Sequence, residues 1–197
     1  GVLEKEMIRA HDLGQAELPI NQKWSWDRIL RSPYIKQADV LQGFYFFEDH
    51  FTPEELEKHF DFYEPFTVHE SSLSPCVHSI QAAKLGRMEQ AYTFYLRTSR
   101  LDLDDYNKEV EEGLHITSMA GTWMSIVEGF GGMRIKEDKL SFEPQIPEQW
   151  DSYIFKINFR GQIVTVRIEQ NKSSFEITGD TELPILVNNK QLTLVPG

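Results

Sequence analysis

The spacing of apolar residues changes at Gly131-Gly132, and this change constrains the fold more than any other feature of the chain. Before these glycines, apolar side chains recur every three or four residues, which is the period of a helix buried on one side. From Leu140 onward, apolar and polar residues alternate, as they do in strands. The sequence therefore predicts two domains, a helical one over residues 1–132 and a β domain over residues 133–197.

Several helix ends carry their own signals. Thr52-Pro53-Glu54-Glu55 has the form of a capping box with proline at the first helical position. Ser74-Pro75 repeats the order of a capping residue and a proline, and Gly86 suits the left-handed conformation that ends many helices. Further helices are expected over 37–47, 88–96 and 115–130. This series of helices is typical of pairs stacked side by side.

The second part of the chain contains turn signals between short strand patterns. Arg160-Gly161 separates two alternating runs, over 153–159 and 163–168, and predicts a hairpin. Two further turns are expected at residues 171–173 and 188–189. They flank strands over 175–178, 185–187 and 192–195. We expect a β meander or part of a sandwich.

Composition excludes several classes of protein. The chain has 197 residues, 40% of them hydrophobic, which is enough for a packed core. Its net charge of -11 repels nucleic acids and anionic membranes, and no apolar run approaches the roughly 20 residues that span a bilayer. The single cysteine, Cys76, fits a reducing compartment. We expect a cytoplasmic protein without nucleic-acid or membrane partners; why the chain starts at Gly1 stays open.

The polar stretch over residues 68–75 is the first candidate site. His69, Glu70, Ser71 and Ser72 precede a predicted helix start. Free backbone amides and the helix dipole favour an anion such as phosphate at such an end, and serine hydroxyls can donate further hydrogen bonds. The alternative is that these residues only cap the helix.

Two other helix starts carry similar polar groups. Lys36 and Gln37 follow the Pro33 break, and their side chains suit sugar hydroxyls, although a solvated first turn is the alternative. His115 precedes an apolar helix, where a lone histidine can also be structural.

Other kinds of site have less support. Residues 102–107 lack the glycine that a calcium loop needs at its sixth position, where Asn107 stands. Residues 129–132 lack the lysine and hydroxyl of a phosphate-binding loop. Cys76 falls on an apolar helical face and is expected to be a buried small residue rather than a nucleophile. We expect no metal and no organic cofactor.

Three stretches carry a family resemblance: KQADVLQGFYFF, VHESSLSPCVHSIQAAKLG and EEGLHITSMAGTW. In this order, they resemble the carboxyl-terminal signatures of glycoside hydrolase family 65, most of all its maltose-cleaving members. The resemblance implies an α+β multidomain protein. Residues 1–132 would be the last helices of a six-hairpin α/α barrel, and residues 133–197 a small all-β sandwich of jelly-roll type.

The resemblance also implies a reaction, the inverting phosphorolysis of maltose by inorganic phosphate to β-D-glucose 1-phosphate and glucose. Phosphate is already an anionic nucleophile, so it needs a cradle in place of the carboxylate with which a hydrolase activates water. Ser71, Ser72 and His115 would bind phosphate, and Lys36 with Gln37 would hold the glucosyl unit.

The catalytic glutamic acid of the family would lie upstream of Gly1, so this chain contains no expected catalytic residue. It is expected to be inactive without the missing amino-terminal part of the enzyme. The complete enzyme is expected to form a homodimer. Trehalose, kojibiose or nigerose are alternative substrates. A non-catalytic carbohydrate-binding or structural fragment is the alternative of another class, suggested by the β domain and by Trp24, Trp26, Trp123 and Trp150.

Overall fold

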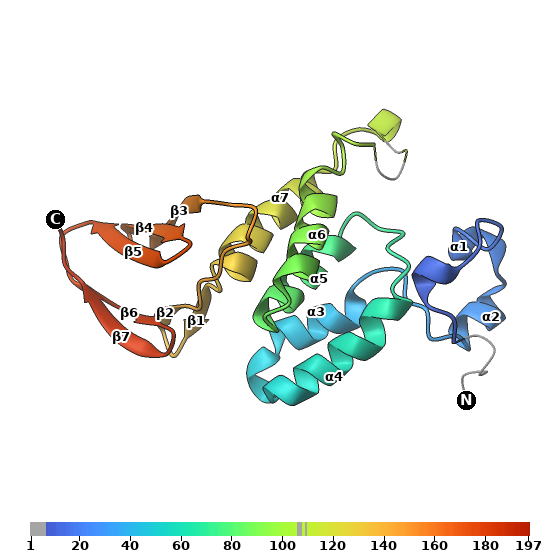
Figure 1. Cartoon of the computed structure of the whole chain (residues 1–197), viewed down its shortest axis with the longest axis horizontal. Coiled ribbons are helices and arrows are strands. Elements are labelled where there is room, and N and C mark those ends of the chain that lie inside the picture. Colours follow the sequence, from blue (N-terminus) through green and yellow to red (C-terminus); the bar gives the residue numbers. More distant parts are fainter. Residues whose placement is uncertain (1–6, 106–107, 109) are drawn as a thin grey trace.

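The computed structural model describes residues 7–105, 108 and 110–197, and it contains helices followed by a small all-β domain with two sheets. Figure 1 shows the helices in the first part of the chain and the strands gathered at the carboxyl-terminal end. Within the described residues, no helix is both long and apolar enough to cross a membrane.

A small cluster of short helices begins the described chain. These are the 3-10 helix η2 (Ala10–Asp12) and helices α1 (Ile20–Lys23) and α2 (Trp26–Leu30). Trp24 is buried here, with its ring 5.4 Å from that of Tyr34. Trp24 is therefore a core residue, whereas Trp26 is 73% exposed.

Two helix hairpins and a further helix form the main helical layer. They are α3 (Asp39–Phe46) with α4 (Pro53–Tyr63), α5 (Ser74–Lys84) with α6 (Met88–Ser99), and α7 (Ile116–Met124). The predicted capping box is confirmed, because the Thr52 hydroxyl accepts from the Glu55 amide at 3.2 Å and the Glu55 carboxylate accepts from the Thr52 amide at 2.9 Å. Gly86 has φ of 72°, as predicted for the end of α5. Short 3-10 helices η3 (Glu48–His50), η4 (Glu64–Phe66) and η5 (Val110–Glu112) lie in the connections.

The long helix predicted over 115–130 changes type part of the way along. α7 ends at Met124 and a π-helical segment, η6 (Ser125–Phe130), continues it. The wider turn is closed by the Gly131 amide, which donates to the Ile126 carbonyl at 2.7 Å. A Cβ at Gly131 would lie 2.5 Å from the Val127 carbonyl oxygen, so the segment requires a glycine there.

Helix α5 is the centre of this layer, since every residue from Ser74 to Ala83 is buried. It packs against α3, α6 and α7. Its polar side chains bond to the neighbours' backbones: Gln81 donates to the Leu41 carbonyl at 2.8 Å, and Ser79 to the Ala91 carbonyl at 2.9 Å. These bonds satisfy polar groups that would otherwise destabilise the core.

The β domain consists of two sheets that enclose an apolar core. One has the order β1 (Arg134–Lys136), β2 (Lys139–Phe142), β6 (Leu183–Val187) and β7 (Lys190–Leu194), and the other is β3 (Ser152–Phe159), β4 (Gln162–Glu169) and β5 (Lys172–Thr178). The side chains of Phe142, Val164 and Ile185 are fully buried between them. β2 and β6 pair in parallel, so only the second sheet is a simple meander.

The predicted hairpins are present, and one of their turns lies one residue earlier than predicted. Arg160-Gly161 joins β3 to β4, and Asn188-Asn189, both with positive φ, joins β6 to β7. The turn predicted at residues 171–173 falls one residue earlier, because Lys172 and Ser173 already pair with β4.

Polar and aromatic contacts join the two parts. Arg134 of β1 forms a largely buried ion pair with Glu48, with 2.8 Å between Nε and Oε1. Trp150 packs edge-on against Tyr95 and Phe130, with ring centroids 5.1 and 5.2 Å away. Trp150 is therefore an interface residue between the helices and the β domain.

The contact between α5 and α7 should depend on Gly121. A Cβ there would lie 2.8 Å from Cβ and 2.9 Å from Sγ of Cys76. We expect Gly121→Ala to lower the free energy of unfolding by about 1–3 kcal/mol, because the two helices would have to separate. Gly43→Ala is the control: this helical glycine has no neighbour within 4 Å of an added Cβ, so the change should stabilise by about 0.4–1 kcal/mol. Equal denaturation midpoints for the two variants would contradict this.

Candidate functional site

The three polar stretches singled out in the sequence all lie at helix starts. Lys36 and Gln37 precede α3, Ser71 and Ser72 precede α5, and His115 is the residue before α7. In Figure 1 the amino ends of these helices lie on the side away from the β domain. The fold thus directs three polar helix starts toward one side of the helical layer.

Backbone hydrogen bonds join the first two stretches. Ile35 forms an isolated parallel bridge with Thr67, and the Glu70 amide donates to the Lys36 carbonyl at 3.1 Å. These bonds place Lys36 beside the segment that contains Ser71. The Lys36 side chain is exposed, and the Gln37 amide donates to the Asp39 carboxylate at 2.8 Å.

Ser71 and Ser72 are half-buried residues in the turn before α5. Ser71 Oγ accepts from the Leu73 amide at 3.3 Å. Leu73 is the N-cap residue, and no side chain caps the helix. In this turn the Ser74 amide donates to the Ser71 carbonyl at 3.5 Å and Pro75 has no N–H, so the two serine hydroxyls are the donors that the turn can offer a ligand.

Ser74 is not the capping residue that its sequence predicted. It is the first residue inside α5, is completely buried, and its Oγ lies 2.7 Å from Nδ1 of His69. His69 has φ of 53°, which turns its ring back toward the helix. This left-handed conformation is uncommon outside glycine, and nothing in the sequence indicated it.

The loop is held by further contacts that the sequence did not reveal. Arg97 of α6 donates to the His69 carbonyl at 3.3 Å, which brings a guanidinium close to the turn. The Glu70 carboxylate accepts from the Ile20 amide at 2.6 Å and is thereby fixed toward α1. Glu70 is thus placed as a structural group.

His115 is oriented by a carboxylate. Its Nδ1 lies 2.5 Å from one oxygen of Asp102, and its backbone amide donates to the other at 2.9 Å. The backbone bond from His115, followed by the ring contact, lowers the pKa of Asp102 below its ordinary value. In the sequence, Asp102 stands out only as part of residues 102–107, which lack the glycine of a calcium loop. Tyr106 and Asn107 of that stretch lie outside the described residues.

A pair of histidines lies directly behind the serine turn. His69 and His78 stack edge to face with ring centroids 4.6 Å apart, and Glu64 lies close to both. Burial, with the Arg97 charge second, lowers the pKa of His69 to about 3. Burial also lowers the pKa of His78 well below its ordinary value. Both rings are therefore neutral.

Comparison with known proteins extends over almost the whole chain. Residues 2–124 match the model of the glycosyl hydrolase family 65 central catalytic domain, and residues 133–194 match that of the family's C-terminal domain. Maltose phosphorylase of Bacillus subtilis (strain 168) is 51% identical over 98% of this chain and 25% of its own length. Alpha,alpha-trehalose phosphorylase of Thermoanaerobacter brockii is 37% identical over 99% of this chain and 25% of its own length.

A solved structure has the same fold as most of this chain. A putative kojibiose phosphorylase from human microbiome superposes with a TM-score of 0.87 and 42% identity, over 93% of this chain and 27% of that one. The chain spans about a quarter of the length of the curated relatives it matches. Two family models in the expected order, together with a relative above half identity, establish that the chain belongs to glycosyl hydrolase family 65.

Proposed function

We propose that this chain contributes the phosphate site and part of the glucosyl site of an inverting disaccharide phosphorylase. The observation that carries the proposal is the common orientation of three polar helix starts, two of them joined by a backbone hydrogen bond between Glu70 and Lys36. An anionic nucleophile needs hydroxyl donors and a cation, and this arrangement supplies these groups.

In this proposal Ser71, Ser72 and His115 bind inorganic phosphate. The hydroxyls of Ser71 and Ser72 donate to phosphate oxygens. The Asp102 carboxylate accepts from Nδ1–H of His115 and so fixes the tautomer and the orientation of the ring. Lys36 and Gln37 hold the glucosyl unit, and the Lys36 ammonium adds a positive charge beside the phosphate.

Phosphate then attacks the anomeric carbon while a general acid protonates the departing sugar oxygen. The bond from phosphate oxygen to carbon forms as the glycosidic bond breaks, with inversion at that carbon. Glu70 is an unsuitable acid because its carboxylate accepts from the Ile20 amide. We propose that a glutamic acid outside this chain supplies the proton, so the chain alone is inactive.

We propose maltose as the substrate, on the basis of the relative with 51% identity. Trehalose is the second candidate, because a phosphorylase of that name is 37% identical. Kojibiose is also a candidate, since several relatives carry that name. The products from maltose would be β-D-glucose 1-phosphate and glucose. A cytoplasmic homodimer completes the proposal.

We also propose that α3 to α7 belong to a six-hairpin α/α barrel. Ile116, Met119 and Trp123 of α7 share one face and are 67%, 47% and 46% exposed. Further barrel helices packed on this face would cover its apolar side chains. This proposal gives Trp123 a packing role.

The direct test is an assay of the full-length protein with phosphate and each of maltose, trehalose, kojibiose and nigerose. We expect release of β-glucose 1-phosphate from maltose, and none from this chain alone. Absence of phosphorolysis with all four sugars would reject the proposed activity.

The serine pair should act on phosphate rather than on sugar. In the full-length protein, replacing both Ser71 and Ser72 by alanine should raise the KM for phosphate about 10- to 150-fold, the effect of losing one hydrogen bond to a charged group. The KM for the disaccharide should change little. The matched control replaces Ser173 and Ser174 of β5 by alanine and should change neither constant. Equal effects of the first double variant on both constants would contradict the assignment.

Asp102 should act through His115. We expect Asp102→Asn to raise the phosphate KM about tenfold. The neutral asparagine amide would replace the charged carboxylate that accepts from the His115 ring. His115→Ala should raise it at least as much, and the two changes together should not be additive. Asp104→Asn, which removes a neighbouring exposed carboxylate paired with Arg100, is the control. An unchanged phosphate KM in His115→Ala would exclude the role of this histidine.

A further inference from the structure

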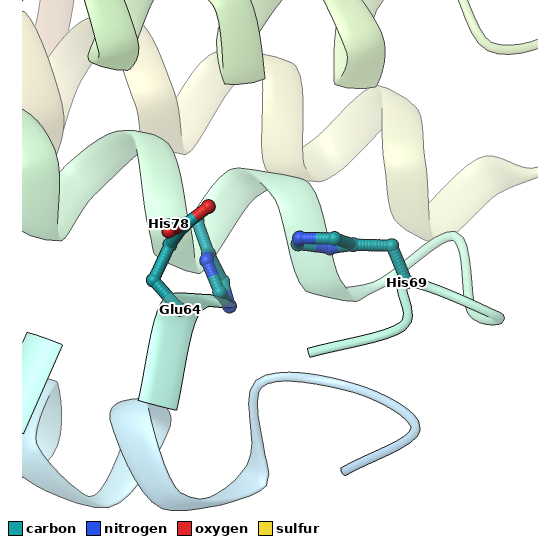
Figure 2. Close-up of side chains that lie close together, drawn as sticks. All are labelled: Glu64, His69 and His78. Carbon is teal, nitrogen blue, oxygen red and sulfur yellow. The ribbon is translucent and has the colours of Figure 1, made fainter. Parts of the chain in front are cut away.

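Three potential metal ligands meet behind the serine turn, and they come from separate segments of the chain. Glu64 begins η4, His69 lies in the loop before α5, and His78 lies in α5. Figure 2 shows the His69 ring pointing across toward His78 and Glu64. One ligand atom from each residue lies within 4.8 Å of the other two.

The two imidazoles hold buried nitrogen atoms that make no hydrogen bond. His78 is completely buried, and neither Nδ1 nor Nε2 has a partner among the described residues. Nε2 of His69 is likewise buried without a partner within that part of the chain. Each such atom costs about 1–3 kcal/mol if nothing binds it. A single ion that binds one nitrogen of each ring would satisfy Nε2 of His69 and one of the two His78 atoms.

The chemistry of this cluster fits a borderline metal ion. We propose that Glu64, His69 and His78 form a binding site for a divalent zinc-type cation, with a water molecule as the fourth ligand. Two neutral imidazoles and one carboxylate are a common zinc donor set. This site is independent of the proposed phosphorolysis and would add a metal that the sequence did not lead us to expect.

The protonation states favour metal binding by the histidines. Both rings stay neutral because burial lowers their pKa values, and the neutral ring is the form that coordinates metals. Glu64 is the carboxylate of the set and supplies its negative charge. The Arg97 charge opposes a cation here, which makes the negative charge of Glu64 essential.

The geometry requires only a small closure. A tetrahedral zinc ion with bonds of about 2.0–2.1 Å separates its ligand atoms by about 3.4 Å. Glu64 is half-buried and has the most flexible of the three side chains, so its carboxylate can move inward. Ser74 already fixes the His69 ring: with Nδ1–H donating to Ser74 Oγ, the lone pair of Nε2 is free for the metal.

A bound ion would connect three segments near the proposed phosphate site. It would tie Glu64, at the end of α4, and the His69 loop to α5. His69 lies two residues before Ser71. The competing explanation is that His78 serves as an apolar packing group, since its ring lies 6.0 Å from that of Phe60 and 5.0 Å from that of Phe94.

The test uses the full-length protein without an affinity tag, stripped with a chelator and titrated with Zn²⁺. We expect one zinc ion per chain that survives gel filtration, and a higher Tm with zinc than after stripping. Co²⁺ in place of zinc should give the visible absorption of a tetrahedral site. None of these measurements depends on activity.

Variants distinguish the two explanations. Glu64→Gln and His78→Leu should each weaken zinc binding by at least about 100-fold, and Ser74→Ala by about 10- to 100-fold. His50→Gln, a change at an exposed histidine outside the cluster, should bind zinc as the unchanged protein does. Glu64→Gln carries the test if His78→Leu fails to fold.

Two results would overturn the proposal. One is a stripped protein that takes up no zinc, with His78→Leu raising Tm as expected for simple packing. The other is zinc uptake that is equal in Glu64→Gln and the unchanged protein, which would place the ion elsewhere.

Discussion

The burial of α5 is the constraint on which the helical part depends. Its residues from Ser74 to Ala83 are buried, and α3, α6 and α7 pack around it. Gly121 allows α7 to approach Cys76 closely. Because α5 cannot shift without disturbing three neighbours, the turn at its amino end has a fixed position. Close packing of this kind is what lets a loop hold ligand-binding groups precisely.

The polar contacts around that turn are consistent with a site organised by backbone groups. The Glu70 backbone amide donates to the Lys36 carbonyl, and the Glu70 carboxylate accepts from the Ile20 amide. A carboxylate in the middle of the turn is thus used for structure. Arg97 holds the His69 carbonyl. These bonds leave the hydroxyls of Ser71 and Ser72 as donors on this turn, and an anion is the ligand they favour.

Local signals in the sequence predicted the elements well, and contacts between distant residues explain what it missed. The Thr52 capping box, Gly86 and the Asn188-Asn189 turn depend on neighbouring residues, and all three were predicted. Ser74 was predicted as a cap because serine before proline is a frequent start. Its hydroxyl instead bonds to His69, whose positive φ depends on the surrounding fold.

The candidate site likewise combines residues that local sequence signals predict with contacts between distant residues that they do not. Ser71, Ser72 and Lys36 could be selected because each stands before a predicted helix. The bond from Glu70 to Lys36 joins residues 34 positions apart, and the partnership of His115 with Asp102 crosses a loop. No periodicity encodes such pairs. The family resemblance supplied the roles of these residues, and the geometry adds Asp102 and Arg97 as positioning groups.

The pair of His69 and His78 affects the charge of the proposed phosphate site. His69 stands two residues before Ser71, but burial keeps its ring neutral, so it adds no positive charge toward a phosphate. The cations near the turn are then Lys36 and Arg97, and Arg97 is one cause of that low pKa. A zinc ion held by one carboxylate would add a net positive charge behind the serines without requiring any imidazole to be protonated.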